Sequence, residues 1–182
     1  MHYEIDIAGY KRKLPLCKIN DELYIGAFIL FGDVEITRVS AEALLKKAPM
    51  FDIIITAESK GIPLAYEMSR QSGKEYIVAR KGSKLYMQDV IETSVNSITT
   101  DHIQKLCLGS DDVSKIKGKK VLIVDDVIST GESLKSIEVL IDQVGGNIVG
   151  KMTVLAEGDA ADRDDIVFLQ KLPLFDAEGK PL

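Results

Sequence analysis

The sequence predicts an α/β fold with a doubly wound, mostly parallel sheet. Apolar runs of strand length alternate with segments of helical periodicity from about residue 51 to 155, and this order is typical of parallel sheets with right-handed crossovers. The run Val-Leu-Ile-Val at 121–124 is continuous rather than alternating, which indicates a strand buried on both faces. We therefore expect helices on both sides of the sheet.

The first 39 residues contain short alternating apolar runs broken by Gly26 and by Gly32. They predict strands or a small irregular structure. Residues 1–39 and the tail, 156–182, are expected to form a cap over the C-terminal edge of the sheet, and 40–155 the core. The sequence shows no internal repeat or low-complexity tract, so we expect the whole chain to be a single domain.

The first half of the core alternates clearly between helix and strand. Ser40 is a favourable N-cap, and a helix is predicted from it as far as Pro49. The apolar run 51–57 predicts a buried strand. A helix is expected at 61–71, with a proline in its first turn and a glycine after its end. Another strand is predicted at 75–80.

The second half begins with a long polar stretch from Lys81 to Ser110. It alternates in two places, which predicts a two-stranded β-arm at about 85–108 with a mobile tip. After the buried run described above, a helix is expected at 132–144, because four apolar side chains share one face and two glycines follow. Further strands are predicted at 148–155 and 166–169.

The composition indicates a globular chain and argues against several classes. Of 182 residues, 46% are apolar and 28% charged, and the formal net charge of −5 gives no support to nucleic-acid binding. No apolar run approaches the roughly 18 residues of a membrane span, and the N-terminus lacks a signal-peptide pattern. Cys17 and Cys107 have no metal-ligand spacing. We expect a cytoplasmic protein with reduced thiols and no membrane partner.

One segment, Val121 to Ser133, carries most of the chemical information. Asp125 and Asp126 follow the buried run, at the edge where open α/β sheets bind ligands. The turn at 129–133 opens a helix, whose free N–H groups and hydroxyls suit a phosphate. Carboxylates for sugar hydroxyls beside a phosphate cradle predict a sugar-phosphate site. An aspartate pair in another doubly wound protein, such as a response-regulator receiver, is the alternative.

The order of strand, acid pair, Thr-Gly-x-Ser turn and helix resembles the 5-phosphoribosyl-1-pyrophosphate (PRPP) signature of the type I phosphoribosyltransferases. The resemblance implies that Asp125 and Asp126 hold the ribose hydroxyls and act in catalysis. It also implies that the 5′-phosphate binds to the turn of Ser129, Thr130, Gly131, Glu132 and Ser133.

Two further segments at strand ends are candidates for pyrophosphate binding. The junction from Thr56 to Gly61 can form a second anion site at a helix N-terminus, although such a junction is often only a turn. The three cations within 80–84 can contact phosphate oxygens or form a solvated basic loop. The resemblance places the pyrophosphate site at Glu58, Ser59, Lys60, Gly61, Arg80, Lys81 and Lys84, with Lys84 also catalytic.

The purine base is expected to stack on apolar residues of the cap. Phe28, Ile29 and Phe31 are the candidates, although core packing also explains any one of them. Glu157 lies just past a predicted strand. It either faces the base or is a surface acid.

Within the family, the chain most resembles the adenine branch and related purine enzymes. Ser129 stands where the best-known hypoxanthine and guanine enzymes carry an aspartate and adenine enzymes a small residue. Adenine enzymes have a glutamate at the tip of the arm, to protonate the leaving purine in the reverse reaction. Here Thr99, Thr100 and Asp101 stand at the tip. Asp101 is the candidate catalytic acid and His102 the other candidate, and a polar, exposed tip without a catalytic role is the alternative.

The resemblance implies a purine phosphoribosyltransferase of purine salvage, which transfers ribose 5-phosphate from PRPP to a purine base. Adenine is the first choice, with hypoxanthine or xanthine as alternatives, and the adenine-like order disfavours a pyrimidine or orotate enzyme. Mg²⁺ is the implied cofactor, and a homodimer the implied assembly. A PRPP- or nucleotide-sensing regulator with this fold is the other class, but no helix-turn-helix is evident in the first 39 residues.

Overall fold

The computed structural model describes residues 1–96 and 103–182. Its strands are β1 (His2–Ile7), β2 (Tyr10–Lys18), β3 (Tyr24–Gly26), β4 (Ile53–Ala57), β5 (Glu75–Ala79), β6 (Ile91–Asn96), β7 (Ile103–Leu108), β8 (Lys120–Ile128), β9 (Asn147–Glu157) and β10 (Val167–Leu172). Its helices are α1 (Val34–Leu45), α2 (Ile62–Ser72), α3 (Ser110–Ile116) and α4 (Glu132–Gln143), with a 3₁₀ helix at Gly158–Asp162.

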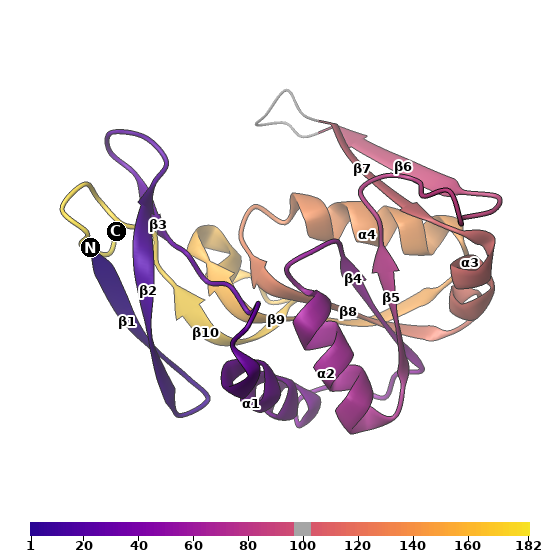
Figure 1. Ribbon diagram of the computed structural model, residues 1–182, viewed down its shortest axis with the longest axis horizontal. Helices are drawn as coiled ribbons and strands as arrows, with labels where there is room; N and C mark the ends of the chain where they lie inside the picture. The colour runs from indigo at the N-terminus through magenta and orange to yellow at the C-terminus, as the bar shows by residue number, and fades with distance from the viewer. Residues whose placement is uncertain (97–102) are drawn as a thin grey trace.

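The centre of the molecule is a five-stranded sheet in the order β10-β9-β8-β4-β5 (Figure 1). Every neighbouring pair in this sheet is parallel. A three-stranded antiparallel sheet, β1-β2-β3, lies at one end of the molecule, and the antiparallel pair β6-β7 lies at the other. No helix in the described part of the chain is long and apolar enough to cross a membrane.

The central sheet has a hydrophobic core on each face. Because side chains alternate along a strand, β4 buries Ile54 on one face and Ile53 and Ile55 on the other. The first face is covered by α1 and α2, and the second by α4, the arm strand β7 and Ile116 at the end of α3. The predicted α/β fold, with helices on both faces of a parallel sheet, is confirmed.

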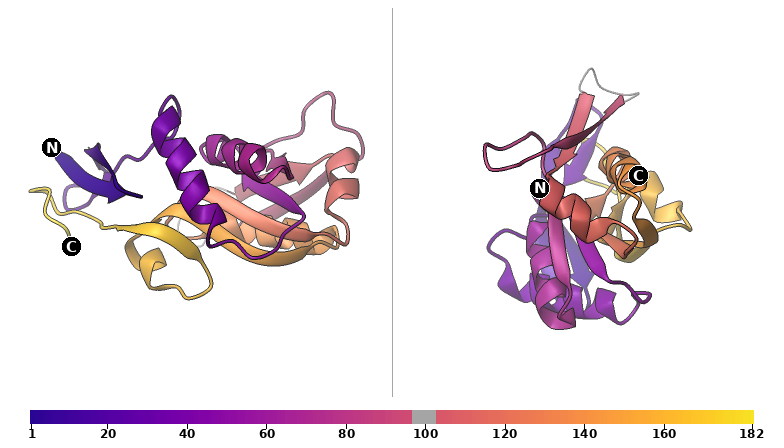
Figure 2. Two further views of the ribbon diagram at one scale, coloured as in Figure 1. Left: turned by 90° about the horizontal axis from the view of Figure 1, so that it is seen from below. Right: turned by 90° about the vertical axis from the view of Figure 1, so that its right-hand side faces the viewer.

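The β1-β2-β3 sheet, which we call the hood, is joined to the other end of the chain. Tyr24 of β3 and Phe175 exchange two backbone hydrogen bonds, of 2.8 and 2.9 Å. The Phe175 side chain is fully buried and packs on Tyr3 of β1, with ring centroids 4.9 Å apart. Both termini therefore lie at this end of the molecule (Figure 2).

The predicted two-stranded arm is present as β6 and β7, which pair from Ile91 opposite Leu108 to Asn96 opposite Ile103. Backbone hydrogen bonds of 3.0 and 2.8 Å between Arg80 and Cys107 join the arm to the end of β5. The arm therefore starts beside the basic segment that follows β5.

Some boundaries differ from the predictions. Helix α1 begins at Val34 and is capped by Asp33, whose carboxylate accepts the Ile36 N–H at 3.1 Å, whereas Ser40, the predicted cap, is fully buried inside the helix. Residues 27–31, within the stretch predicted as strands or a small irregular structure, are irregular. The seven-residue α3 was not predicted. The other two predicted helices agree with α2 and α4 within one residue.

Asp33 also connects α1 to the hood. Its carboxylate oxygens accept hydrogen bonds from Nε and Nη2 of Arg12 in β2, at 2.6 and 3.0 Å. The bonds from Arg12 hold the pKa of Asp33 below its ordinary value. One side chain thus satisfies a helix end and fixes the approach of the hood.

We expect Asp33→Ala to lower the free energy of unfolding by about 1–2 kcal/mol, since the cap of α1 and the bidentate partner of Arg12 are lost together. Urea denaturation followed by circular dichroism measures this loss. The control is Asp21→Ala, because Asp21 is exposed and pairs only with Lys18. Its loss should stay below about 0.5 kcal/mol, and equal losses would contradict the role of Asp33.

Candidate functional site

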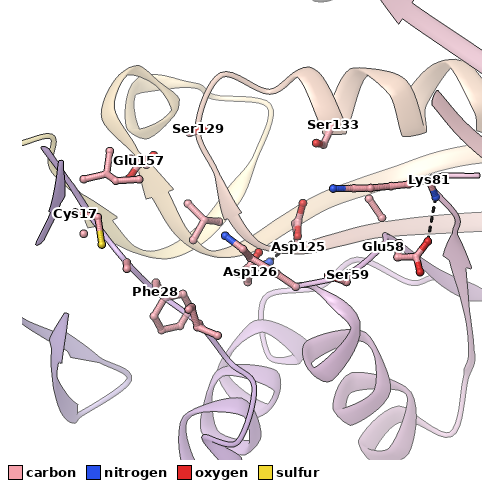
Figure 3. A pocket seen from close by; sticks show the side chains of 17 residues that line it. Cys17, Phe28, Glu58, Ser59, Lys81, Asp125, Asp126, Ser129, Ser133 and Glu157 are labelled. Atoms are coloured by element: carbon pink, nitrogen blue, oxygen red, sulfur yellow. Dashed lines mark hydrogen bonds between the residues drawn. The ribbon is translucent and has the colours of Figure 1, made fainter. Parts of the chain in front are cut away.

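A cleft of about 440 Å³ lies between the hood and the C-terminal edge of the parallel sheet (Figure 3). Its walls come from the hood and the segment after it, the β4–α2 loop, the C-terminal ends of β8 and β9, and the start of α4. The predicted site residues that line it are Phe28, Ile29, Glu58, Ser59, Lys60, Lys81, Asp125, Asp126, Ser129, Ser133 and Glu157.

The acid pair lies at the centre of the cleft, inside β8 rather than after it, because β8 continues to Ile128. The Asp126 N–H donates to Oδ1 of Asp125 at 2.9 Å. Asp126 is 4% exposed, and its Oδ2 has no hydrogen-bond partner among the described residues. Buried polar atoms are normally hydrogen-bonded, so this oxygen is available to accept a hydrogen bond in the cleft.

Burial makes both carboxyls harder to ionise. It raises the pKa of Asp125 well above the ordinary value, and the neighbouring charge of Asp126 raises it further. Burial also raises the pKa of Asp126 and of Glu157. The positive charge of Lys60 opposes the rise at all three. Lys60, predicted as a pyrophosphate ligand, therefore also acts on the acids of the cleft.

The β4–α2 loop packs directly against the acid pair. A Cβ atom at Gly61 would lie 2.3 Å from Oγ1 of Thr56 and 2.8 Å from Oδ1 of Asp125, so only glycine fits at this position. The peptide bond between Glu58 and Ser59 is cis. The loop presents Ser59 and Lys60 to the cleft.

Glu58 organises the basic segment that follows β5. It accepts the Lys81 N–H at 3.1 Å and pairs with Nη1 of Arg80 at 3.3 Å. This hydrogen bond from the Lys81 N–H is the main reason that the pKa of Glu58 is lowered. Arg80 also donates through Nη2 to the Tyr86 hydroxyl at 2.9 Å. Lys81 lines the cleft, whereas Arg80 and the exposed Lys84 do not.

The predicted phosphate turn forms a smaller cavity of about 170 Å³ beside the acid pair, lined by Asp125 and residues 127–134. Gly131 is the N-cap of α4, with φ of 79°, a conformation that favours glycine. The N-terminus of α4 therefore lies at this cavity, and helix N-termini bind anions in many proteins.

The hood end of the cleft contains Cys17, Phe28 and Glu157 (Figure 3). Phe28 is buried, while Ile29 lines the cleft and is half exposed. The prediction that Phe31 lines the base site is wrong. Phe31 lines a separate pocket at α1 and α2 and not this cleft, because the chain after Ile29 turns away toward α1.

Several lining residues were not predicted, among them Cys17, Ile25, Ala27 and Val127. The hood residues reach the cleft only through tertiary packing, and no local pattern marks them. Asp101 and His102 lie outside the described residues. Within the described part of the chain, no three His, Cys, Asp or Glu side chains gather as a metal site.

Residues 34–180 match the model of the phosphoribosyl transferase domain. The chain belongs to the phosphoribosyltransferase family. It is 30% identical over 165 residues to the adenine phosphoribosyltransferase of Acetivibrio thermocellus, covering 80% of this chain and 84% of that protein. It is 29% identical over 167 residues to the enzyme of the same name from Petrotoga mobilis, covering 84% and 86%.

Another relative is a regulator. The chain is 28% identical over 111 residues to the purine biosynthesis transcriptional repressor PurR of Bacillus subtilis, covering 61% of this chain and 38% of that protein. Among solved structures, adenine phosphoribosyltransferase from Thermoanaerobacter pseudethanolicus has a TM-score of 0.67 at 23% identity, covering 94% and 95% of the two chains. The Saccharomyces cerevisiae enzyme, solved with adenine, has a TM-score of 0.66 at 16% identity, covering 93% of each. These structures support the fold.

We expect Asp125→Asn to stabilise the protein at neutral and alkaline pH. Because the pKa of Asp125 is higher in the folded than in the unfolded chain, folding favours the protonated carboxyl. That stabilisation is complete below the ordinary aspartate pKa and is lost as the pH rises through the raised value. Asparagine stays neutral, so the gain in the free energy of unfolding should be largest near about pH 8 and should vanish near about pH 4.

Thermal and urea unfolding of both proteins across this pH range measures the difference. Asp164→Asn, at an exposed aspartate, is the control and should leave the profile unchanged. Equal stability of the wild type and Asp125→Asn at every pH would show that burial does not raise the pKa of the Asp125 carboxyl.

Proposed function

We propose that this protein is an adenine phosphoribosyltransferase, which transfers ribose 5-phosphate from PRPP to adenine and releases pyrophosphate. One observation carries the proposal: the buried acid pair, with the unpartnered Oδ2 of Asp126, lies between a phosphate turn and a second anion loop in one cleft. Membership of the family and similarity to enzymes named adenine phosphoribosyltransferase support it.

Each part of the substrate has a matching region of the cleft. The 5′-phosphate would bind to the turn at 129–133 and the ribose hydroxyls to the acid pair. The pyrophosphate would bind to the loop at 58–61 and to Lys81. Arg80 and Lys84, from the same basic segment as Lys81, would complete this site. The base would lie at the hood end, against Phe28 and Ile29. The ribose is thereby held between its leaving group and its nucleophile.

The reaction is a displacement at C1′ of the ribose, where a purine nitrogen replaces pyrophosphate. Its transition state is expected to resemble an oxocarbenium ion. The protein contributes by holding the two reactants and by stabilising charge. Asp125 and Asp126 place negative charge near the ribose, and Lys60 and Lys81 place positive charge near the departing pyrophosphate. Catalytic roles for Lys84 and Asp101 stay predictions from the sequence.

The acid pair fits Mg²⁺. This ion prefers oxygen ligands and is usually held by one or two carboxylates together with substrate phosphates. Asp125 and Asp126 supply such oxygens, and Oδ2 of Asp126 has no partner in the described structure. When bound, Mg²⁺ would neutralise charge on the pyrophosphate. The substrate oxygens complete the site, since no third acid gathers there within the described residues.

Glu157 supports adenine as the base. Its carboxyl lies at the hood end of the cleft, with no hydrogen bond to another described residue. A carboxylate only accepts hydrogen bonds. It therefore suits the 6-amino group of adenine, whereas the 6-oxo group of hypoxanthine or xanthine is itself an acceptor and cannot donate to Glu157.

We further propose a cytoplasmic homodimer. Cys17 and Cys107 are both free thiols, as expected in a reducing compartment. Phe31, Val34 and Tyr66 are exposed by 54%, 78% and 53% and meet on α1 and α2. An exposed apolar cluster of this kind is typical of an interface.

The specific alternative is a regulator, which the similarity to PurR favours. The test is to incubate the protein with PRPP, Mg²⁺ and one base at a time and to measure pyrophosphate. Release should be fastest with adenine.

Asp126→Asn should lower kcat/KM by about a hundredfold or more, since an amide cannot replace the charged acceptor. The variant should keep the native circular dichroism spectrum. Binding of PRPP without pyrophosphate release for any base would favour the regulator.

We expect Glu157→Gln to change base selection, because the amide can donate to a 6-oxo group. The ratio of kcat/KM for adenine to that for hypoxanthine should fall by about tenfold or more. Glu178→Gln, at an exposed glutamate, is the control and should leave the ratio unchanged. An unaltered ratio in Glu157→Gln would exclude Glu157 from base recognition.

A further inference from the structure

Arg163 lies against the phosphate turn, although it is far from it in sequence. A Cβ atom at Gly131 would lie 2.6 Å from Nη1 of Arg163. The guanidinium therefore occupies the space over Gly131 that a side chain would fill. Arg163 comes directly after the 3₁₀ helix that follows β9, so it reaches the turn from a different part of the fold.

The orientation of Arg163 is fixed by neighbouring charges. Its Nε and Nη2 donate to the two carboxylate oxygens of Asp165, both at 2.8 Å. This bidentate pairing restrains the planar group and leaves Nη1 on the side of the turn. Asp165 also accepts Nζ of Lys151 at 2.8 Å, and Lys151 pairs with Glu138 of α4. The network thus ties β9 and α4 to the segment that carries Arg163.

The turn needs a positive charge that its own residues do not supply. Residues 129–133 contain one acid, Glu132, and no cation, and Asp125 lines the same cavity. A phosphate entering the cavity therefore meets negative charge, and the helix N-terminus offers only partial positive charge. Arg163 is not among the residues that line the cavity. It can act on the phosphate through Gly131 and through its charge behind the turn.

We propose that Arg163 is a positioning residue for the 5′-phosphate end of the substrate, which holds Gly131 in place and adds positive charge behind the turn. The inference rests on the proposed function in one respect, that the turn binds a sugar phosphate. It does not depend on the identity of the base.

The test compares Arg163→Gln and Arg163→Lys with the wild-type protein. Calorimetry with ribose 5-phosphate should show about tenfold weaker binding for Arg163→Gln, and a smaller loss for Arg163→Lys, which keeps the charge without the bidentate fork. With PRPP and base, Arg163→Gln should raise the KM for PRPP by a similar factor. Its kcat and its KM for the base should stay within about twofold, because neither reports on the 5′-phosphate.

The structure indicates that Arg163→Gln will fold, since Asp165 keeps its bond to Lys151. The control is Arg38→Gln, which removes an exposed arginine of α1 that forms a 3.9 Å ion pair with Glu42. This variant should bind ribose 5-phosphate as the wild type does.

Three results would overturn the inference. These are unchanged ribose 5-phosphate binding in Arg163→Gln, equal loss of affinity for sugar phosphate and base together with a lower thermal midpoint, and no binding of ribose 5-phosphate by the wild type. The proposed function fails separately. If the wild type binds ribose 5-phosphate but releases no pyrophosphate with any base, while Arg163→Gln binds it more weakly, the enzyme proposal is wrong and the role of Arg163 stands.

Discussion

Two adjacent carboxyls buried inside the central strand are the constraint on which the rest of the structure depends. Asp125 and Asp126 lie in β8, between β4 and β9, where burial raises the pKa of both. Burying an acid without a full set of partners is unfavourable. The surroundings reduce this cost through the charge of Lys60 and through the bond from the Asp126 N–H, but they leave one oxygen unsatisfied. The protein therefore maintains a destabilising arrangement at the point where a ribose would bind, as active sites often do.

The two candidate anion sites are placed by the same geometry. In a parallel sheet the C-terminal ends of all strands lie at one edge, and here β4 and β8 are each followed by the N-terminus of a helix, α2 and α4. The loop after β4 and the turn after β8 therefore face the same cleft from neighbouring strands. The missing side chain at Gly61 lets the first loop contact Asp125, and the positive φ of Gly131 lets the second turn enter α4. The sheet topology thus directs both segments toward the cleft, and the two glycines allow their backbones to approach it closely.

Features carried by contiguous residues were predictable from the sequence, and features made by tertiary contact were not. The acid pair, the turn before α4 and the loop before α2 each lie within one short segment, and each was found. The start of α1 was missed because Asp33 gains a partner, Arg12, from another sheet. Cys17 and Arg163 reach the cleft and the turn from distant segments, and Phe31 differs from Phe28 only in how the chain turns after it. The match to the family also begins at Val34, so the hood residues that line the cleft lie outside the matched segment.

The pairing of Tyr24 with Phe175 has a consequence for how substrate range can change in this family. It fixes the hood, which under the proposed function would face the base, to a residue near the other end of the polypeptide. Terminal stretches can be lengthened, shortened or exchanged without disturbing the order of the strands between them. Under the proposed function, a lineage could therefore alter base selection by remodelling the hood, while the segments at 58–61 and 125–133 stay unchanged.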